Sequence, residues 1–182
     1  MHQTMAEEWS IINRELLEET EMEDEVMFWM RAGGFRSKDT VSMTWNGDQN
    51  TDWTRSDGLK SSIVCSLSLA LGGIGLTHND IGGYTNTPIL GTMTGKVVCK
   101  LQLVTAFLTG INRNKELLLR WAEYAVFTPV MRTHEGSHPK SNHQVYDDED
   151  TMTKFGRLTN IFSSLYDYHR EAIRQVLEWT KA

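Results

Sequence analysis

The sequence predicts a protein of the α/β class with parallel strands. Three apolar runs of strand length each lead into polar residues, within Ser42–Trp53, Ile74–Tyr84 and Pro129–Glu135. Helix-like sequence follows each of them, and strands that alternate with helices are typical of a parallel sheet. The three strand ends carry Asp48, Asp80 and His134. Because a β/α barrel forms its active site at the C-terminal ends of its strands, these side chains are the first candidates for a site.

Length and composition fit one globular domain. The chain has 182 residues, of which 40% are hydrophobic and 23% are charged, as is usual for globular proteins. Its formal net charge is −6, and since a nucleic acid would require a clustered basic face, we expect no nucleic-acid partner. No apolar run approaches the ~18 residues of a membrane span, so we expect no transmembrane segment. Cys65 and Cys99 supply neither a disulfide framework nor a zinc set.

The N-terminal part predicts a helix followed by a buried strand. Thr4–Glu7 has the spacing of a capping box, and apolar residues then recur at helical intervals through residue 19. Val26–Met30 is an uninterrupted apolar run, the pattern of a parallel strand buried on both faces. Arg31 follows directly, so its guanidinium needs a partner at the strand end, and Asp80 or a substrate hydroxyl would serve.

The next strand leads to Asp48. Val41–Trp45 alternates apolar with small polar residues, which is the period of a strand, and Gly47 lets the backbone turn as the strand ends. We expect Ser56 to cap the helix that follows and Gly72 to end it.

The remaining pattern predicts a strand at 74–78, a helix capped by Asn114, a strand at 129–133 and two helical stretches to the end of the chain. Four strands are too few for a closed eight-stranded barrel, which takes roughly 250 residues. We therefore expect residues 1–182 to form the C-terminal half of a larger barrel, a partial (β/α)8 TIM barrel of about four strands with flanking helices.

Residues 88–110 do not fit this pattern. No acidic residue occurs between Asp80 and Glu116, in a chain otherwise rich in them, and residues 91–110 have no clean period. We predict an atypical insert at about 88–110, either a lineage-specific loop or a translated non-coding stretch.

Asp48 is the strongest candidate for chemistry. It lies between Trp45 and Trp53, and a carboxylic acid against aromatic surface is partly desolvated, which raises its pKa as a general acid requires. Tryptophan beside a carboxylate also suits sugar binding, because aromatic faces stack on pyranose rings. The alternative is that Asn46–Asp48 is only a turn.

Other polar side chains follow the predicted strands. His78 and His134 could bind hydroxyls or a metal, although a hydrogen-bonded structural role is the default for a single histidine. The histidine spacing matches no zinc pattern, so we assign no metal site. Gly82 and Gly83 allow a close approach of the backbone to another group, and Tyr84 supplies a hydroxyl beside them.

Together these motifs resemble glycoside hydrolase family 31, and within it the sulfoquinovosidases. The resemblance is carried by Phe28–Gly33, Trp45–Trp53, His78–Tyr84, Lys115–Trp121 and Phe127–Gly136. It implies that Asp48 is the general acid/base and that Arg31 and His134 contact the substrate. It also implies that the substrate is bound by Trp45, Gln49, Asp80 and Tyr84. Of these residues, Tyr84 helps to recognise the sulfonate.

The resemblance implies retaining hydrolysis of α-sulfoquinovosides such as sulfoquinovosyl glycerol, with no cofactor. That mechanism uses two carboxylates about 5–5.5 Å apart, and nothing in residues 1–25 matches the motif of the family's nucleophilic aspartate. We therefore expect these 182 residues alone to be inactive. Two alternatives stay open: an α-glucosidase or α-xylosidase of the same family, and a non-catalytic, sugar-binding remnant.

Overall fold

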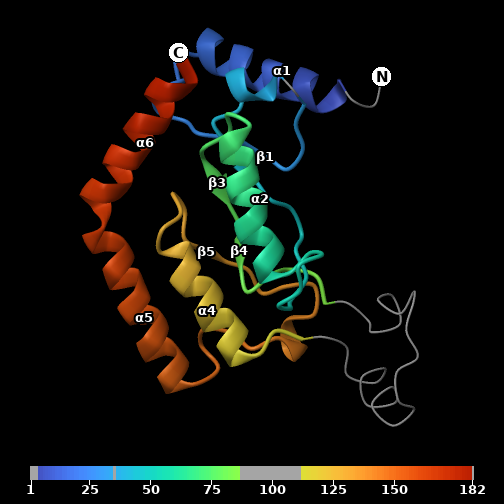
Figure 1. The fold of residues 1–182 in the computed structure, drawn as a ribbon, viewed down its shortest axis with the longest axis vertical. Helices are drawn as coiled ribbons and strands as arrows, with labels where there is room; N and C mark the ends of the chain where they lie inside the picture. The colour runs from blue at the N-terminus through green and yellow to red at the C-terminus, as the bar shows by residue number, and fades with distance from the viewer. Residues whose placement is uncertain (1–3, 35, 87–111, 182) are drawn as a thin grey trace.

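The computed structural model describes residues 4–34, 36–86 and 112–181 and has an α/β fold (Figure 1). Its helices, including short 3-10 turns, are α1 (Met5–Glu19), η1 (Ser37–Asp39), α2 (Leu59–Leu71), α4 (Lys115–Ala125), η3 (Pro139–Ser141), α5 (Glu149–Ser164) and α6 (Tyr166–Lys181). Its strands are β1 (Trp29–Met30), β2 (Met43–Trp45), β3 (Thr77–His78), β4 (Asp80–Ile81) and β5 (Arg132–Thr133). The predicted class is therefore confirmed. The predicted insert at 88–110 lies outside the described residues.

All strand pairs among the described residues are parallel. β2 has β1 on one side and β3 on the other, with Trp45 opposite His78. β4 follows β3 directly but pairs with β5, with Asp80 opposite Arg132. The segment 77–81 therefore has β2 as one neighbour and β5 as the other, and it links the three-stranded sheet to the two-stranded one.

The first strand differs from its prediction. Val26–Met30 was expected to be buried on both faces, but only Trp29–Met30 pairs, and Val26 and Met27 are 37% and 48% exposed. The reason is the position of β1 at the edge of its sheet, where it pairs only with β2 among the described strands. An apolar run by itself does not distinguish an edge strand from a central one.

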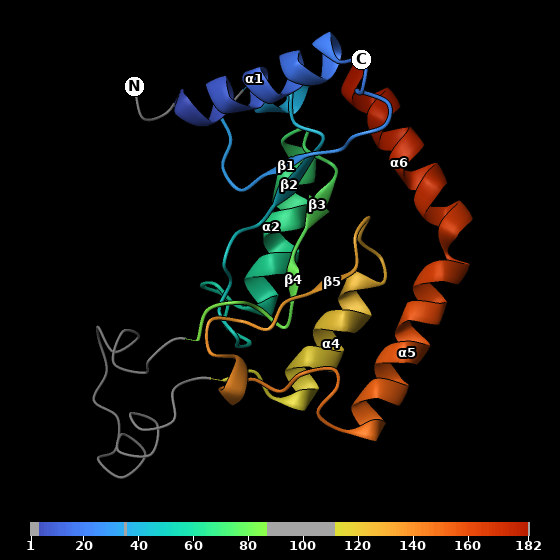
Figure 2. The same ribbon diagram turned by 180° about the vertical axis from the view of Figure 1, so that it is seen from behind.

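Helix α4 supplies most of the core. The side chain of Asn114 accepts a hydrogen bond from the Leu117 amide at 2.8 Å, which confirms the predicted cap. One face of α4 is buried, and the helix packs against β4 and α5 (Figure 2). The core cluster is Leu59, Ile81, Leu117, Leu118, Trp121, Ala122 and Ala125. The helix thereby fixes the position of the segment that carries Asp80.

Helix α2 begins later than predicted. Its N-cap residue is Gly58, and Ser56 does not cap it. The preceding turn folds over Asp52, whose backbone carbonyl accepts from the Leu59 amide at 3.0 Å, and a Cβ at Gly58 would overlap Asp52. Only glycine fits this close approach. The predicted end at Gly72 is confirmed.

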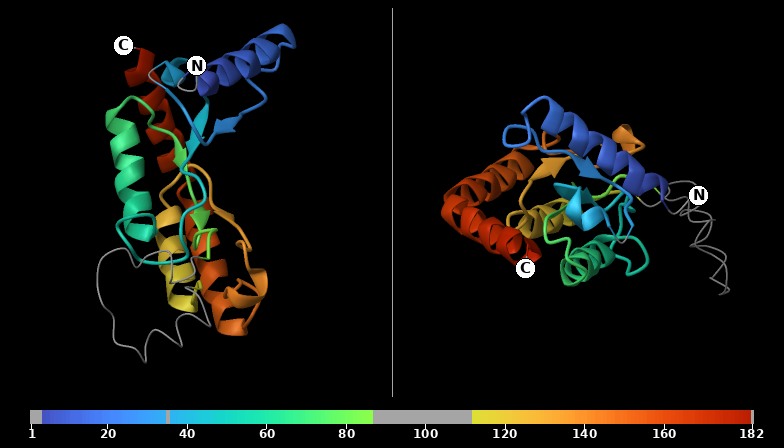
Figure 3. Two further views of the ribbon diagram at one scale, coloured as in Figure 1. Left: turned by 90° about the vertical axis from the view of Figure 1, so that its right-hand side faces the viewer. Right: turned by 90° about the horizontal axis from the view of Figure 1, so that it is seen from above.

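Helix α1 has the predicted length but not the predicted cap. The Thr4 side chain makes no cap hydrogen bond, and the Glu7 carboxylate instead accepts from the Arg36 amide at 3.0 Å. The helix lies across one end of the fold, at the same end as the last turns of α6 (Figure 3). Among the helices of the described part of the chain, none is long and apolar enough to cross a membrane.

We expect Leu118→Ala to lower the free energy of unfolding by about 2–5 kcal/mol, because Leu118 is only 1% exposed within the core cluster and the deletion leaves a cavity. Urea denaturation measures the difference. The matched control is Leu71→Ala at the end of α2, where the side chain is 87% exposed and the expected change is within about 0.5 kcal/mol. Equal effects of the two substitutions would contradict the core assignment.

Candidate active site

The loops that follow β2, β4 and β5 are hydrogen-bonded to one another at the C-terminal ends of the strands. The Tyr84 amide donates to the Gln49 carbonyl at 2.8 Å, and the Ser137 amide donates to the Tyr84 carbonyl at 2.8 Å. Asn50 and Thr85 form a parallel bridge between the first two loops. The loop that carries Asp48 is therefore tied to the loop of Tyr84, which in turn is tied to the loop after His134.

Asp48 lies beside Arg31. Gly47 has φ +88°, so the chain turns at the end of β2 as the sequence predicts, and Asp48 follows the turn. Its Oδ2 is 3.3 Å from Nη2 of Arg31, with side chains 33% and 58% exposed. The Arg31 guanidinium also lies over the Trp45 ring, 5.1 Å from its centroid. The structure thus brings these three predicted site residues together in a group that is open to solvent.

Of the two partners suggested for Arg31, Asp80 or a substrate hydroxyl, Asp80 is wrong. Asp80 is 1% exposed and binds the guanidinium of Arg132, which lies opposite it on β5. Arg31 lies instead at the accessible end of β1, where Asp48 is its partner. The reason is register: parallel pairing places Asp80 and Arg132 side by side.

Arg132 connects Asp80 with His78. Its Nε donates to Nε2 of His78 at 2.9 Å, and its guanidinium lies 5.9 Å from the Trp29 ring centroid. Because an arginine nitrogen can only donate, Nε2 of His78 is the acceptor and Nδ1 carries the proton. Burial, and then the charge of Arg132, lower the pKa of His78 to about 4. His78 is therefore neutral near pH 7.

Electrostatic interactions place Asp80 near two other candidates. Burial raises the pKa of the Asp80 carboxyl, while Arg132 and then His134 oppose the rise and the negative charge of Asp48 adds to it. Oδ2 of Asp80 finds no hydrogen-bond partner within the described residues. Asp80, Asp48 and His134 thus share one electrostatic environment, with Asp80 on its buried side.

Tyr84 and His134 form a second group. Their rings meet edge to face at 89°, with centroids 4.8 Å apart, and both residues are partly buried. Nδ1 of His134 accepts from the Gly136 amide at 3.1 Å, so in the neutral imidazole the proton is on Nε2. A hydroxyl and a ring N–H are therefore available side by side.

Gln49 lies behind these groups. Its side chain is buried, and its Oε1 accepts a hydrogen bond from the Ser62 hydroxyl on α2. Its backbone carbonyl holds the amides of Tyr84 and Thr85 at 2.8 and 2.9 Å. In this structure Gln49 joins the Asp48 loop to α2 and to the Tyr84 loop, and its role in substrate binding stays a prediction.

Sequence reasoning did not single out Arg132 or Ser62. Arg132 precedes His134 by two residues, and since side chains alternate along a strand, this spacing places both on one face of the strand. The same spacing relates His78 to Asp80. That signal was present in the sequence. The contact of Ser62 with Gln49 had no signal, because it depends on how α2 packs.

Parallel strands with helices between them, and acidic, basic and aromatic side chains at the C-terminal strand ends, are the arrangement of part of a β/α barrel. Residues 1–171 match the TIM-barrel domain of glycosyl hydrolases family 31, and the chain belongs to this family. The predicted family and the predicted partial barrel are both confirmed.

Similar proteins include two curated sulfoquinovosidases. That of Escherichia coli is 42% identical over 173 residues, which are 95% of this chain and 22% of that protein. That of Agrobacterium fabrum is 37% identical over 168 residues, which are 92% of this chain and 22% of that protein. The chain therefore spans less than a quarter of the length of these relatives.

A solved structure is also similar. It is a family 31 sulfoquinovosidase from E. rectale in complex with an aza-sugar inhibitor, and it superposes with a TM-score of 0.77 at 39% sequence identity. The match covers 94% of this chain and 23% of that one. The arrangement of strands and helices described above is thus that of part of a family 31 barrel.

We expect the buried His78 to make stability depend on pH. The pKa of His78 is about 4 in the folded chain against 6.5 for an ordinary histidine, so unfolding takes up a proton between these values. Stability attributable to His78 is therefore lost as the pH falls from 6.5 to 4, by up to about 3 kcal/mol. Denaturant unfolding of wild type and His78→Gln at several pH values measures it, since glutamine can accept from Arg132 but does not titrate.

The control is His138→Gln, in an exposed position on the loop after β5, which should keep the wild-type dependence on pH. If His78→Gln loses as much stability between pH 6.5 and pH 4 as wild type does, the neutral, buried state of His78 is refuted.

Proposed function

We propose that this chain provides the acid/base side of a retaining α-glycosidase of the sulfoquinovosidase type. The observation that carries the proposal is the Asp48 carboxylate, one-third exposed at the end of β2 and 3.3 Å from Arg31. The motif around it, Trp45–Trp53, is the one that the resemblance assigns to the acid/base. The similarity to two sulfoquinovosidases over nearly the whole chain supports the choice of substrate class.

In the proposed reaction Asp48 acts twice. It donates a proton to the glycosidic oxygen as a second carboxylate attacks the anomeric carbon, so that the bond from this carbon to the glycosidic oxygen breaks and a glycosyl-enzyme ester forms. The Asp48 carboxylate then accepts a proton from the water that hydrolyses the glycosyl-enzyme ester. Arg31 and His134 are proposed to bind sugar hydroxyls, with the Trp45 ring beside them.

We propose that Tyr84 and Gln49 favour a sulfonated sugar. The Tyr84 hydroxyl can donate to a sulfonate oxygen, and a hydrogen bond to a charged group is among the stronger kinds. Gln49 contributes by holding the Tyr84 loop through its backbone carbonyl. Asp80 is proposed to reach the sugar from the buried side of the same site.

The second carboxylate of the mechanism is assigned to no described residue. The chain spans 22% of the curated sulfoquinovosidases, so we propose the activity for the catalytic barrel of which residues 1–182 form the C-terminal part. A hybrid with the Escherichia coli enzyme, in which this chain replaces the matching segment, provides both carboxylates for a test.

We expect this hybrid enzyme to hydrolyse 4-nitrophenyl α-sulfoquinovoside in preference to the α-glucoside, and Asp48→Asn to lower its turnover roughly 10²–10⁴-fold through loss of general acid/base catalysis. Release of 4-nitrophenol measures both. Azide should restore turnover of the Asp48→Asn variant with formation of a glycosyl azide, because this anion attacks the glycosyl-enzyme without giving up a proton.

The matched control is Asp57→Asn, an exposed carboxylate on the same loop, which should keep activity. Preference for the glucoside would favour the rival assignment as an α-glucosidase. Full activity of Asp48→Asn, or no rescue by azide, would exclude Asp48 as the acid/base.

We expect Tyr84→Phe in the hybrid to lower kcat/KM for the sulfoquinovoside about 10–100-fold, the value of one hydrogen bond to a charged group. The glucoside, which has no sulfonate, should change much less. Steady-state kinetics with the two substrates provide the comparison, and equal losses for both would remove Tyr84 from sulfonate recognition.

A further inference from the structure

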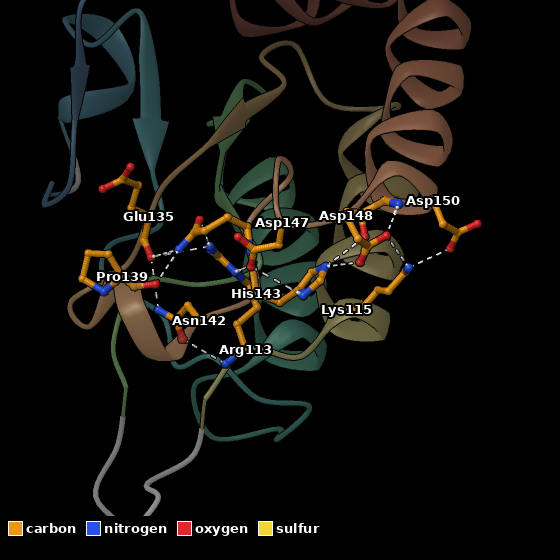
Figure 4. Close-up of polar contacts among 11 residues, drawn as sticks. Arg113, Lys115, Glu135, Pro139, Asn142, His143, Asp147, Asp148 and Asp150 are labelled. Carbon is orange, nitrogen blue, oxygen red and sulfur yellow. Dashed lines mark hydrogen bonds and ion pairs between the residues drawn. The ribbon is translucent and has the colours of Figure 1, made fainter.

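Arg113 is a buried arginine that holds three loops together. It is 2% exposed and directly precedes Asn114, the cap of α4. Its side chain points away from the helix, into the space between the loops that follow β4 and β5, and Figure 4 shows the polar contacts around it. No part of the proposed mechanism uses Arg113, so its position needs another explanation.

The guanidinium donates to each of the three loops. On the β4 side it binds the carbonyls of Ile81 and Gly83 at 3.3 and 3.4 Å. On the β5 side it binds the carbonyls of His134 and Glu135 at 2.7 and 3.5 Å. On the loop before α5 it binds the His143 carbonyl at 2.9 Å and Oε1 of Gln144 at 2.6 Å.

The six acceptors are neutral oxygen atoms, and five of them belong to the backbone. Burial lowers the pKa of Arg113 to about 10, so it is charged at neutral pH. A planar fork of donors can bind carbonyls in several directions at once, which the single ammonium group of lysine cannot do. The directions of these hydrogen bonds therefore favour arginine over lysine at position 113.

Gly82 packs closely against the side chain of Arg113. Its φ is +86°, and a Cβ at this position would overlap Cδ of Arg113. The close approach that the sequence predicts at Gly82 and Gly83 is thus made by Arg113 at the first glycine. At the second glycine it is made by the backbone of Asn50.

Asn142 and Gln144 support the arginine. The Arg113 amide donates to Oδ1 of Asn142 at 3.0 Å, and Nδ2 of Asn142 donates to the Glu135 carbonyl at 3.1 Å. Nε2 of Gln144 donates to the carbonyls of Glu135 and Pro139 at 3.0 and 3.1 Å (Figure 4). The loop before α5 is therefore fixed against the loop after β5 independently of the guanidinium.

We propose that Arg113 is a positioning residue that sets the Tyr84 and His134 side chains against each other and so shapes the sugar site opposite Asp48. It binds the carbonyl of Gly83, the residue before Tyr84, and the carbonyl of His134 itself. Movement of either loop would break one of these contacts and separate the two rings. That the rings contact a sugar rests on the proposed function.

The test is amide hydrogen exchange in the 182-residue chain, comparing wild type with Arg113→Lys. The loop amides of Gly83, Tyr84, Ser137 and His143, all hydrogen-bonded to backbone carbonyls, should exchange at least about tenfold faster in the variant, because local opening becomes easier. Amides within α4 should be unchanged. In nuclear magnetic resonance spectra the ring-current shifts between Tyr84 and His134 should collapse.

The matched control is Arg120→Lys. Arg120 lies on α4 with its side chain 55% exposed and pairs with Glu123 at 2.9 Å, so its replacement should leave the loop amides as they are. Unchanged exchange in Arg113→Lys would overturn the proposal. Equal acceleration in the loops and in α4 would also overturn it, because Arg113 would then stabilise the fold as a whole.

A titration of the hybrid enzyme with sulfoquinovose, with and without Arg113→Lys, separates this inference from the proposed function, which is made for the complete barrel. The hybrid with Arg113 should show shifts at Tyr84 and His134, and its Arg113→Lys variant should need at least about tenfold more sugar for the same shifts. Binding that is unchanged in Arg113→Lys would refute a positioning role in the site. Failure of the hybrid with Arg113 to bind would count against the proposed function, while the exchange result would still decide whether Arg113 fixes the two rings.

Discussion

Parallel pairing on both sides of the segment 77–81 is the constraint on which the rest of the structure depends. Its first half bonds to β2 and its second half to β5, so the loops after these strands emerge at one end. The loops that carry Asp48, Tyr84 and His134, far apart in the sequence, become neighbours for this reason. The hydrogen bonds between their loops follow from the pairing and reinforce it.

The change of partner within this segment occurs at Asn79. Its Oδ1 accepts from Nδ2 of Asn46 at 3.0 Å, and the same Nδ2 donates to the Ser66 hydroxyl on α2. Ser66 in turn accepts from the Tyr124 hydroxyl on α4 at 2.9 Å. Two helices and two strand segments are thus joined by side chains at the point where β3 gives way to β4.

The charged groups divide into a buried set and an accessible set. The buried Asp80 and neutral His78 both bind the guanidinium of Arg132, and without this arginine the Asp80 carboxylate would be a buried, unpaired charge, which is costly. Asp48 and Arg31 form the accessible pair. Asp48 is therefore the acid of the two that a solute can reach, and Asp80 is not, which fits the role in proton transfer that we propose for Asp48.

Local signals in the sequence determined much of this fold. Several features depend only on residues close together in the sequence: the strand that leads to Asp48, the turn at Gly47, the cap at Asn114 and the alternation of strands with helices. Their patterns can therefore be recognised without knowledge of tertiary contacts. The motifs also led to the family, and through it to the candidate residues at the strand ends.

Other features were decided only by tertiary structure, because they depend on which segments meet. The edge position of β1 leaves Val26 and Met27 exposed. The register of β4 with β5 makes Arg132, and not Arg31, the ion-pair partner of Asp80. Nothing near Arg113 in sequence indicates that its guanidinium lies among the carbonyls of three loops. Backbone carbonyls carry no sequence signal, so contacts made to them become visible only when the chain is folded.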